Sequence, residues 1–209
     1  MTARRKSRLV ALVGGSGAGK SWLAGEIQKA VGDGVDRLSQ DDFYLDRSHL
    51  APARREHVNY DHPRAIDWAR LEKALNECRA GRVFRVPRYD FATHTRLPRS
   101  ERRRPKPVTI VEGLWLLRRP SLRRLFDLRI FLDCPVRLRL VRRIARDAAE
   151  RGRSRDSVQR QFWKTVAPMH DRHVAPQAGF ADVVLRGSPG SAQVRQLADQ
   201  VRAGTQERN

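Results

Sequence analysis

One stretch of the chain has the residue types and the spacing of a phosphate-binding loop. It fits the pattern G-x-x-x-x-G-K-[ST] at every fixed position, and its residues are Gly14, Gly15, Ser16, Gly17, Ala18, Gly19, Lys20 and Ser21. Glycine reaches backbone angles that other residues avoid, so successive N–H groups of such a loop can turn toward a polyanion. We expect the loop to bind a nucleoside triphosphate, with Lys20 at its β- and γ-phosphates and the Ser21 hydroxyl on Mg²⁺. The alternative is a glycine-rich turn that only joins a strand to a helix.

The segments on either side of this loop are those that the motif requires. Residues 9–13 are a short apolar run, which predicts a buried parallel strand. Residues 22–30 contain helix formers, with Leu23, Ile27 and Ala30 at helical spacing on one face. The positive end of that helix dipole and its free N–H groups would face the phosphates. A strand, a glycine loop and a helix in this order predict an α/β fold.

Carboxylates follow or end two further predicted strands. Residues 35–39 lead into Asp41 and Asp42, and Glu112 lies near the end of the buried run 108–113. Open α/β sheets bind ligands at the carboxyl ends of their strands. Asp41 or Asp42 could therefore accept a proton from an attacking hydroxyl or orient Mg²⁺, and a helix-capping or loop aspartate is the alternative. Glu112 occupies the position of a Walker-B carboxylate, which predicts a direct or second-sphere contact to Mg²⁺.

An aromatic segment lies between these strands. Alternation along it would place Tyr89, Phe91 and Thr93 on one face, beside His94. An aromatic pair next to a histidine suits stacking on, and hydrogen bonding to, a flat heterocycle, whereas core packing is the alternative. The run 99–107, rich in Arg and Pro, predicts a solvated loop.

A long helix is predicted from Pro135 to about Gly152, and a second helix follows at about 156–166. At about 100° per residue, one side of the first helix is apolar and the other is basic. The apolar side comprises Leu140, Val141, Ile144, Ala145 and Ala148, and the basic side Arg139, Arg142, Arg143 and Arg146. An arginine face that leads to a glycine hinge is typical of a lid that clamps phosphates. The alternative is a solvated basic face.

Length and composition limit the class of protein. At 209 residues, with 40% hydrophobic and 32% charged residues, the chain supports one soluble α/β domain. It has no apolar run near the roughly 20 residues of a membrane span, and the run at 9–13 predicts the first strand rather than a signal peptide. Cys78 and Cys134 have no paired spacing, which favours a reducing compartment, the cytoplasm. The net charge of +20 is nearly all arginine spread along the chain, which indicates compositional bias rather than a nucleic-acid-binding arm.

Together these stretches resemble the uridine kinase (uridine-cytidine kinase) family of P-loop kinases. The matching pieces occur in family order between about residues 8 and 187, and the ordered set is highly specific. They are residues 14–21, 39–41, 43–44, 59–63, 87–96, 111–113, 142–153, Gln161 and 180–183.

The resemblance implies a three-layer P-loop NTPase fold, in which helices flank a parallel sheet of about five strands. It also implies a small β-hairpin over the nucleoside and an arginine-rich helical lid. The expected organisation is one kinase domain over residues 1–209, with a nucleoside-binding insertion at about 42–107 and the lid at about 139–166.

The activity that the resemblance implies is transfer of the γ-phosphate of ATP or GTP to the 5′-hydroxyl of uridine or cytidine, with Mg²⁺, in pyrimidine salvage. The expected partner is the pyrimidine ribonucleoside, and the expected assembly is a homotetramer. We expect no membrane and no nucleic-acid partner. One alternative is a P-loop kinase for another small-molecule alcohol, and the other is a nucleotide-gated nucleic-acid-binding protein.

The resemblance also implies roles for single residues. Asp41 matches the catalytic aspartate, and Ser21 and Glu112 match the Mg²⁺ ligands, with Asp41 beside them. Nucleoside contacts are matched by Asp61 at the ribose hydroxyls, by Tyr89, Phe91 and His94 around the base, and by Arg153 and Gln161. Arg143 and Arg146 match lid arginines near the phosphates, and Arg146 joins Asp41 and Lys20 in the expected catalytic set.

Overall fold

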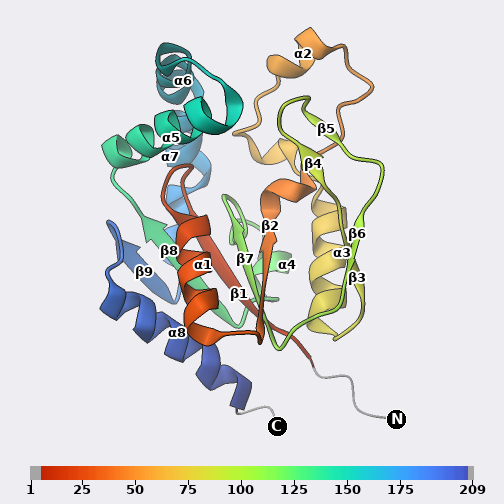
Figure 1. Ribbon diagram of the computed structural model, residues 1–209, viewed down its shortest axis with the longest axis vertical. Coiled ribbons are helices and arrows are strands. Elements are labelled where there is room, and N and C mark those ends of the chain that lie inside the picture. The colour runs from red at the N-terminus through yellow and green to blue at the C-terminus, as the bar shows by residue number, and fades with distance from the viewer. Residues whose placement is uncertain (1–5, 207–209) are drawn as a thin grey trace.

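Five strands form one parallel β-sheet (Figure 1). The computed structural model describes residues 6–206. The strands lie in the order β2-β7-β1-β8-β9, and every neighbouring pair is parallel. Their bounds are β1 Arg8–Gly14, β2 Val35–Ser39, β7 Val108–Gly113, β8 Leu128–Asp133 and β9 Val183–Arg186. Because the strands are parallel, their carboxyl ends meet at one edge, where the phosphate loop and the predicted carboxylates lie.

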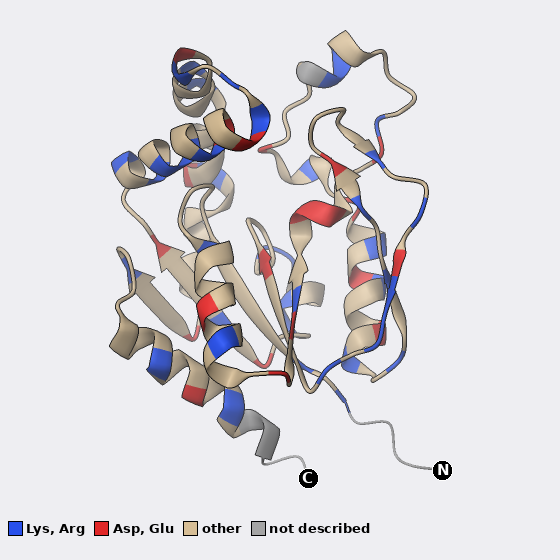
Figure 2. Cartoon of the chain, in the orientation of Figure 1, with Lys and Arg blue, Asp and Glu red and all other residues tan. Residues whose placement is uncertain are grey.

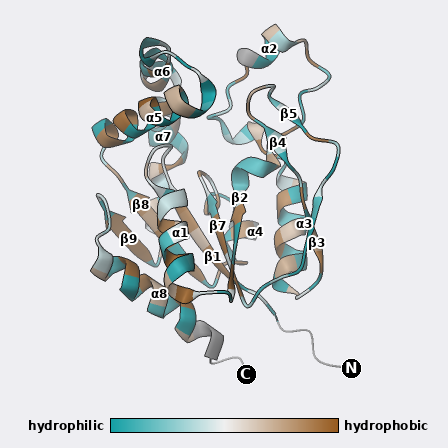
Figure 3. Cartoon of the chain, in the orientation of Figure 1, coloured by the Kyte–Doolittle hydropathy of each residue, from teal (hydrophilic) through white to brown (hydrophobic). Residues whose placement is uncertain are grey.

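Helices cover both faces of the sheet because both faces of β1 are apolar. Leu9, Ala11 and Val13 pack in the cluster that includes Leu71 and Leu75 of α3 (Trp68–Arg79). The alternate residues of β1 pack with α1 (Lys20–Val31) and α8 (Ser191–Gln206) on the other face. Figure 3 shows the apolar residues concentrated in the central strands. The three-layer fold with a five-stranded parallel sheet is therefore confirmed.

The other elements form two groups above the carboxyl edge of the sheet and along its side. Between β2 and β7 the chain forms η1 Gln40–Phe43, α2 Pro52–Glu56, η2 Pro63–Ala65, α3, β3 Phe84–Val86, β4 Tyr89–Asp90, β5 Thr95–Arg96 and β6 Glu101–Arg103. After β7 it forms α4 Pro120–Arg123, and after β8 it forms α5 Val136–Arg151, α6 Arg155–Gln161, the π-helix η3 Phe162–Val166, α7 Ala167–His173 and η4 Ala175–Phe180. In Figure 1, α5 and α6 stand on one side above the sheet, and the β4–β5 hairpin stands on the other.

The prediction of a solvated loop at residues 99–107 is wrong at its centre. Glu101–Arg103 form strand β6, which pairs with β3 in antiparallel register. Arg103 fixes this strand because its Nη1 donates to the Arg37 carbonyl at 2.7 Å and its Nε donates to Glu101 Oε1 at 2.9 Å. Arginine in this segment thus makes a tertiary contact, which composition alone does not indicate.

The predicted alternation after Tyr89 is also wrong. Strand β4 ends at Asp90, whose carboxylate accepts hydrogen bonds from the Ala92 N–H and the Thr93 hydroxyl, both at 2.8 Å. Phe91 and Thr93 therefore lie in a turn rather than on one strand face. Tyr89 is buried, whereas Thr93 is exposed.

The buried side of α5 is its basic side, not its apolar side. Arg139, Arg143 and Asp147 are its buried positions, and they repeat every four residues. Val141, on the predicted apolar side, is 62% exposed. The reason is the phosphate loop, against which α5 packs: a Cβ atom at Gly17 would lie 2.3 Å from the Arg139 carbonyl oxygen. The solvated basic face considered for this helix is thereby excluded at Arg139 and Arg143.

Lys and Arg are distributed over every layer of the molecule (Figure 2). This distribution agrees with compositional bias and shows no single basic arm in the described part of the chain. Within residues 6–206, no helix is both long and apolar enough to cross a membrane.

Candidate functional site

The phosphate loop connects β1 to α1, so it lies at the carboxyl edge in the middle of the sheet. Gly17 and Gly19 have positive φ values of 78° and 98°, which side chains with a Cβ rarely adopt. The loop is closed by a hydrogen bond of 3.0 Å from the Ala18 N–H to the Gly15 carbonyl. Helix α1 begins at Lys20, so its free N–H groups and the positive end of its dipole face the loop. The loop is thus shaped for a polyanion.

Ser21 and Glu112 come together from the first turn of α1 and the end of β7. Ser21 Oγ donates to Glu112 Oε2 at 2.6 Å, although 91 residues separate them. Strands β1 and β7 are neighbours, with Leu12 paired to Glu112, and this register brings the carboxylate beside the phosphate loop. Arg37 Nη2 lies 3.6 Å from Glu112 Oε1 and partly offsets its charge.

Lys20 and Asp41 share the same environment. Lys20 Nζ donates to the Gly15 carbonyl at 3.1 Å. Burial lowers the pKa of Lys20, and the charges of Asp41 and Glu112 oppose that decrease. Burial raises the pKa of Asp41, and the charges of Lys20 and Arg146 oppose that rise. These groups therefore lie within electrostatic range of one another.

Asp41 carries a polar atom that nothing within the described residues satisfies. Its Oδ1 is buried and has no hydrogen-bond partner there. The Asp41 N–H donates to Ser39 Oγ at 3.2 Å, which caps the short helix η1. Buried polar atoms in proteins are nearly always hydrogen-bonded, so an unsatisfied carboxylate oxygen beside a phosphate loop fits a metal ion or a substrate hydroxyl.

The residues present fit a Mg²⁺ ion whose remaining ligands are water and phosphate oxygens. Within the described residues, no group of three His, Cys, Asp or Glu side chains gathers as a protein-only metal site. The Ser21 hydroxyl with the carboxylates of Glu112 and Asp41 offers a partial set of oxygen ligands. Mg²⁺ usually takes one or two protein carboxylates and completes its shell with water and phosphate oxygens.

Asp42, the alternative to Asp41, lies in a different environment. It lines a cavity of about 610 Å³ that is also lined by Glu101, Arg103 and Glu112. Burial raises the pKa of Asp42 to about 6, and the charge of Arg103 opposes the rise. Asp41, whose carboxyl interacts with Lys20, is the aspartate on the side of the phosphate loop.

Gln40 is a positioning residue that the sequence pattern did not single out. It is fully buried, and its Oε1 accepts hydrogen bonds from the N–H groups of Leu114 and Trp115 at 2.8 and 3.0 Å. These bonds join η1, which carries Asp41, to the end of β7, which carries Glu112. A Cβ atom at Gly113 would lie 2.5 Å from Gln40 Oε1, so the contact requires glycine there. In the sequence, a glutamine between the end of a predicted strand and a candidate catalytic aspartate is the signal that could have identified Gln40.

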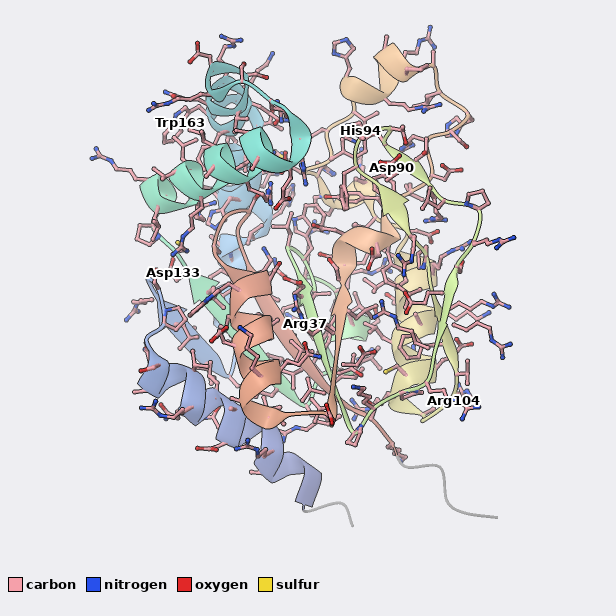
Figure 4. The ribbon with its side chains drawn as sticks, viewed as in Figure 1. Arg37, Asp90, His94, Arg104, Asp133 and Trp163 are labelled. Carbon is pink, nitrogen blue, oxygen red and sulfur yellow. The ribbon has the colours of Figure 1, made fainter. Side chains whose placement is uncertain are left out.

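The predicted base-binding residues form one aromatic cluster. The ring of Tyr89 lies 5.3 Å from that of Phe91 and 5.2 Å from that of Tyr44. His94 stacks on Tyr60, with ring centroids 4.3 Å apart and an interplanar angle of 11°. His94 has a positive φ of 55°, and Figure 4 shows it with Asp90 at the turn of the β4–β5 hairpin. Tyr44 and Tyr89 are buried in the hydrophobic core, and Tyr60 and Phe91 pack against it, so core packing, the alternative to base binding, accounts for these contacts.

Tyr44 joins this cluster to the acidic residues. Its hydroxyl donates to the Tyr60 carbonyl at 3.0 Å. Burial raises the pKa of Tyr44 well above its usual value, and the charges of Asp41 and Asp61 raise it further. Both carboxylates are thus near one buried tyrosine, which was not among the predicted site residues.

Arg143 connects helix α5 to both sides of the site. Its Nη1 donates to Ser16 Oγ of the phosphate loop at 3.0 Å and to Asp61 Oδ1 at 3.4 Å. Its Nη2 donates to Gln161 Oε1 at 3.2 Å, and Arg153 Nη1 donates to the same oxygen at 2.6 Å. The structure therefore brings together Asp61, Arg143, Arg153 and Gln161, which the sequence predicted separately.

Arg146 makes its contacts within the lid. It donates to Asp147 Oδ1 from both Nε and Nη2, at 2.9 and 2.7 Å. The Arg151 guanidinium lies 5.2 Å from the centre of the Phe91 ring, which brings the end of α5 against the hairpin. Asp147 and Arg151 were not among the predicted site residues. The pattern that could have indicated Asp147 is a single aspartate on the basic side of an arginine-rich helix.

The sequence of this chain is similar to those of known proteins. A sequence model of the phosphoribulokinase/uridine kinase family matches residues 9–192. A curated protein from Staphylococcus aureus (strain JH9), named uridine kinase, is 40% identical over 182 residues, which are 87% of this chain and 88% of that protein.

Two solved structures resemble the fold. The phosphoribulokinase from Rhodobacter spheroides aligns with a TM-score of 0.65 at 18% identity, over 87% of this chain and 70% of that one. The D-glycerate 3-kinase from Cryptococcus neoformans var. grubii aligns with a TM-score of 0.58 at 17% identity, over 79% of this chain and 78% of that one. The family match spans most of the chain and a relative is 40% identical, so this chain belongs to the phosphoribulokinase/uridine kinase family.

Proposed function

We propose that this chain is a uridine kinase that transfers the γ-phosphate of ATP or GTP to the 5′-hydroxyl of uridine or cytidine. The 40% identity to a protein of that name, over nearly the whole of both chains, supports the nucleoside as acceptor. The observation that carries the proposal is the buried, unsatisfied Oδ1 of Asp41, which lies in the environment of Lys20 and Glu112.

On the donor side, the chain binds and neutralises phosphate. The N–H groups of the phosphate loop and the start of α1 hold the phosphates, and Lys20 and Arg146 offset charge that develops on the transferring group. Ser21 and Glu112 would hold Mg²⁺, with Asp41 beside them. The ion, when bound, neutralises phosphate charge and orients the γ-phosphate.

On the acceptor side, Asp41 accepts the proton of the 5′-hydroxyl as the oxygen attacks. A raised pKa makes its carboxylate a stronger base than an exposed aspartate. Asp61 accepts hydrogen bonds from the ribose hydroxyls, with Arg153 and Gln161 beside it. Tyr89, Phe91 and His94 surround the base. Transfer then depends on positioning and charge, with little covalent chemistry for the protein.

Three further features are part of the proposal. The chain is one kinase domain in which residues 42–107 bind the nucleoside and residues 139–166 form the lid. Two free cysteines support a cytoplasmic location. We expect a homo-oligomer, with a tetramer as the expected state, which light scattering coupled to gel filtration measures.

Initial-rate phosphorylation across a panel of acceptors tests the function. ADP formation from ATP and Mg²⁺ is measured with uridine, cytidine, 2′-deoxyuridine, adenosine and small sugar phosphates. We expect turnover with uridine, cytidine or both. No turnover with either, together with turnover of another alcohol, would identify a P-loop kinase with a different acceptor.

A further inference from the structure

Asp147 is a fully buried carboxylate in the middle of the lid arginines. It lies on the inward side of α5, one helical turn after Arg143, and has 0% exposed surface. Its oxygens lie within 4 Å of the guanidinium groups of four arginines. The distances are 3.5 Å to Arg143, 2.7 Å to Arg146, 3.8 Å to Arg151 and 3.7 Å to Arg153.

The charges of this cluster do not cancel. One carboxylate faces four guanidinium groups, so an excess of positive charge remains around it. Like charges this close repel one another, most strongly at Arg143, which is buried, and less at the other three, which water reaches. The shared carboxylate is therefore what allows the four cations to lie together before an anionic ligand arrives.

The geometry leaves most arginine donors available for other partners. Among the described residues, the side chain of Arg146 alone donates hydrogen bonds to the Asp147 carboxylate, and both go to Oδ1. Asp147 Oδ2 has no hydrogen-bond partner within the described residues, although Arg143 and Arg153 lie near it. Arg143 instead directs its donors to Ser16, Asp61 and Gln161, which lie at the site.

We infer that Asp147 is a positioning residue that gathers the lid arginines and aims them at the transferring phosphate. This inference rests on the proposed kinase function. Asp147 is itself fully buried against the guanidinium groups, so it acts through Arg146 and Arg143. Without its charge, the arginines repel one another and turn toward solvent.

A purely structural role for Asp147 gives different expectations. Its backbone carbonyl accepts hydrogen bonds from the N–H groups of Gly152 and Arg153, which end helix α5. A side-chain substitution leaves these bonds in place. If the side chain only stabilised the helix end, its loss would lower the melting temperature and reduce activity whether or not Arg146 is present.

A double-mutant cycle separates the two roles. The variants are Asp147→Asn, Arg146→Met and the double variant, with Glu150→Gln as an exposed control on the same helix. We expect Asp147→Asn to lower kcat for uridine by about 10- to 100-fold, the scale of a misplaced catalytic group, and Glu150→Gln to leave it unchanged. In the Arg146→Met background, Asp147→Asn should lower kcat by a much smaller factor. Equal, additive losses in both backgrounds would overturn the inference.

Two further measurements keep the test decisive. If Asp147→Asn does not fold, Asp147→Glu keeps the charge but moves the carboxylate by one methylene, and full activity of that variant would refute a positioning role.

Calorimetric titration with ATP and Mg²⁺, without a nucleoside, measures the contribution of the arginines to ATP affinity independently of the acceptor. If the wild type binds ATP but does not phosphorylate uridine, the proposed function fails. Loss of ATP affinity in Asp147→Asn, but not in Glu150→Gln, then still supports the inference, and equal affinity refutes it.

Discussion

Replacing Asp41 by asparagine removes a negative charge and a proton acceptor while keeping the shape of the side chain. The Asp41 N–H bond to Ser39 Oγ does not depend on the side chain and should persist. The substitution exchanges one carboxylate oxygen for an NH₂ group at a carboxylate whose Oδ1 is buried and has no hydrogen-bond partner within residues 6–206. The substitution therefore affects the proposed chemistry with little expected effect on the fold.

The size of the effect follows from the role of the carboxylate. A positioned general base contributes about 10²- to 10⁴-fold to a reaction, which corresponds to about 3–5 kcal/mol of barrier. We expect kcat of Asp41→Asn to fall within that range. The affinity for uridine, measured by calorimetry, should change little, because the ribose and base are held by other residues.

The pH dependence gives a second expectation with a definite sign. Burial raises the pKa of Asp41, and the base works only when it is ionised. The wild-type rate should therefore decrease as the pH falls through this raised pKa, and Asp41→Asn should lack that acidic limb. The assay is the initial rate of ADP formation at saturating uridine, ATP and Mg²⁺ over the acidic to neutral range.

Asp42→Asn is the matched control because it is the same change at the next residue. Asp42 faces the cavity that Arg103 and Glu101 line, so we expect near wild-type kcat and an unchanged acidic limb. Near wild-type activity of Asp41→Asn, or an equal loss in Asp42→Asn, would show that the assignment of the base to Asp41 is mistaken.

Three other predictions follow from the same site. Lys20→Ala should lower kcat by about 10²- to 10³-fold with an unchanged circular dichroism spectrum; a nearly active variant would contradict the role of Lys20. Because Asp61 would lose a hydrogen-bond partner, 2′-deoxyuridine should be disfavoured against uridine by about 1–3 kcal/mol in kcat/KM, and Asp61→Asn should reduce this preference. The folded pKa of Asp42, about 6, lies above its unfolded value, so ionising it costs stability as the pH rises through about 6. Asp42→Asn should therefore be stabilised relative to wild type on the order of 1–2 kcal/mol at neutral pH and less at acidic pH. Urea unfolding at both pH values measures this, and an unchanged difference would contradict it.

The central sheet and the phosphate loop could be predicted because their signals are local. A strand, a glycine loop and a helix are contiguous in the sequence, and the apolar runs of β1 and β7 mark them as buried on both faces. The predicted strand at residues 9–13 is β1, and the predicted helix at 22–30 lies within α1. Carboxylates near strand ends, such as Glu112, could be placed because all parallel strands end at the same edge.

The insertion and the lid could not be predicted equally well because their conformations depend on distant partners. Strand β6 exists because Arg103 reaches the Arg37 carbonyl across 66 residues of sequence. The side of α5 that is buried depends on the phosphate loop, which accepts arginine donors where hydrophobic periodicity alone would bury Val141. Hydrophobic periodicity identified the apolar and basic sides of this helix, but it did not show which side is buried and which faces solvent.

The sequence by itself determined the kind of chemistry: an anion-binding loop, a hydroxyl and carboxylates for a metal, and a surplus of arginine. Only the tertiary structure decided which of these groups meet. It separates Asp41 from Asp42, joins Arg143 to Asp61 across 82 residues, and buries Asp147 among four arginines. The physical reason is that a local pattern specifies backbone conformation and residue type, whereas charge pairing between distant segments is settled when the sheet and the lid pack together.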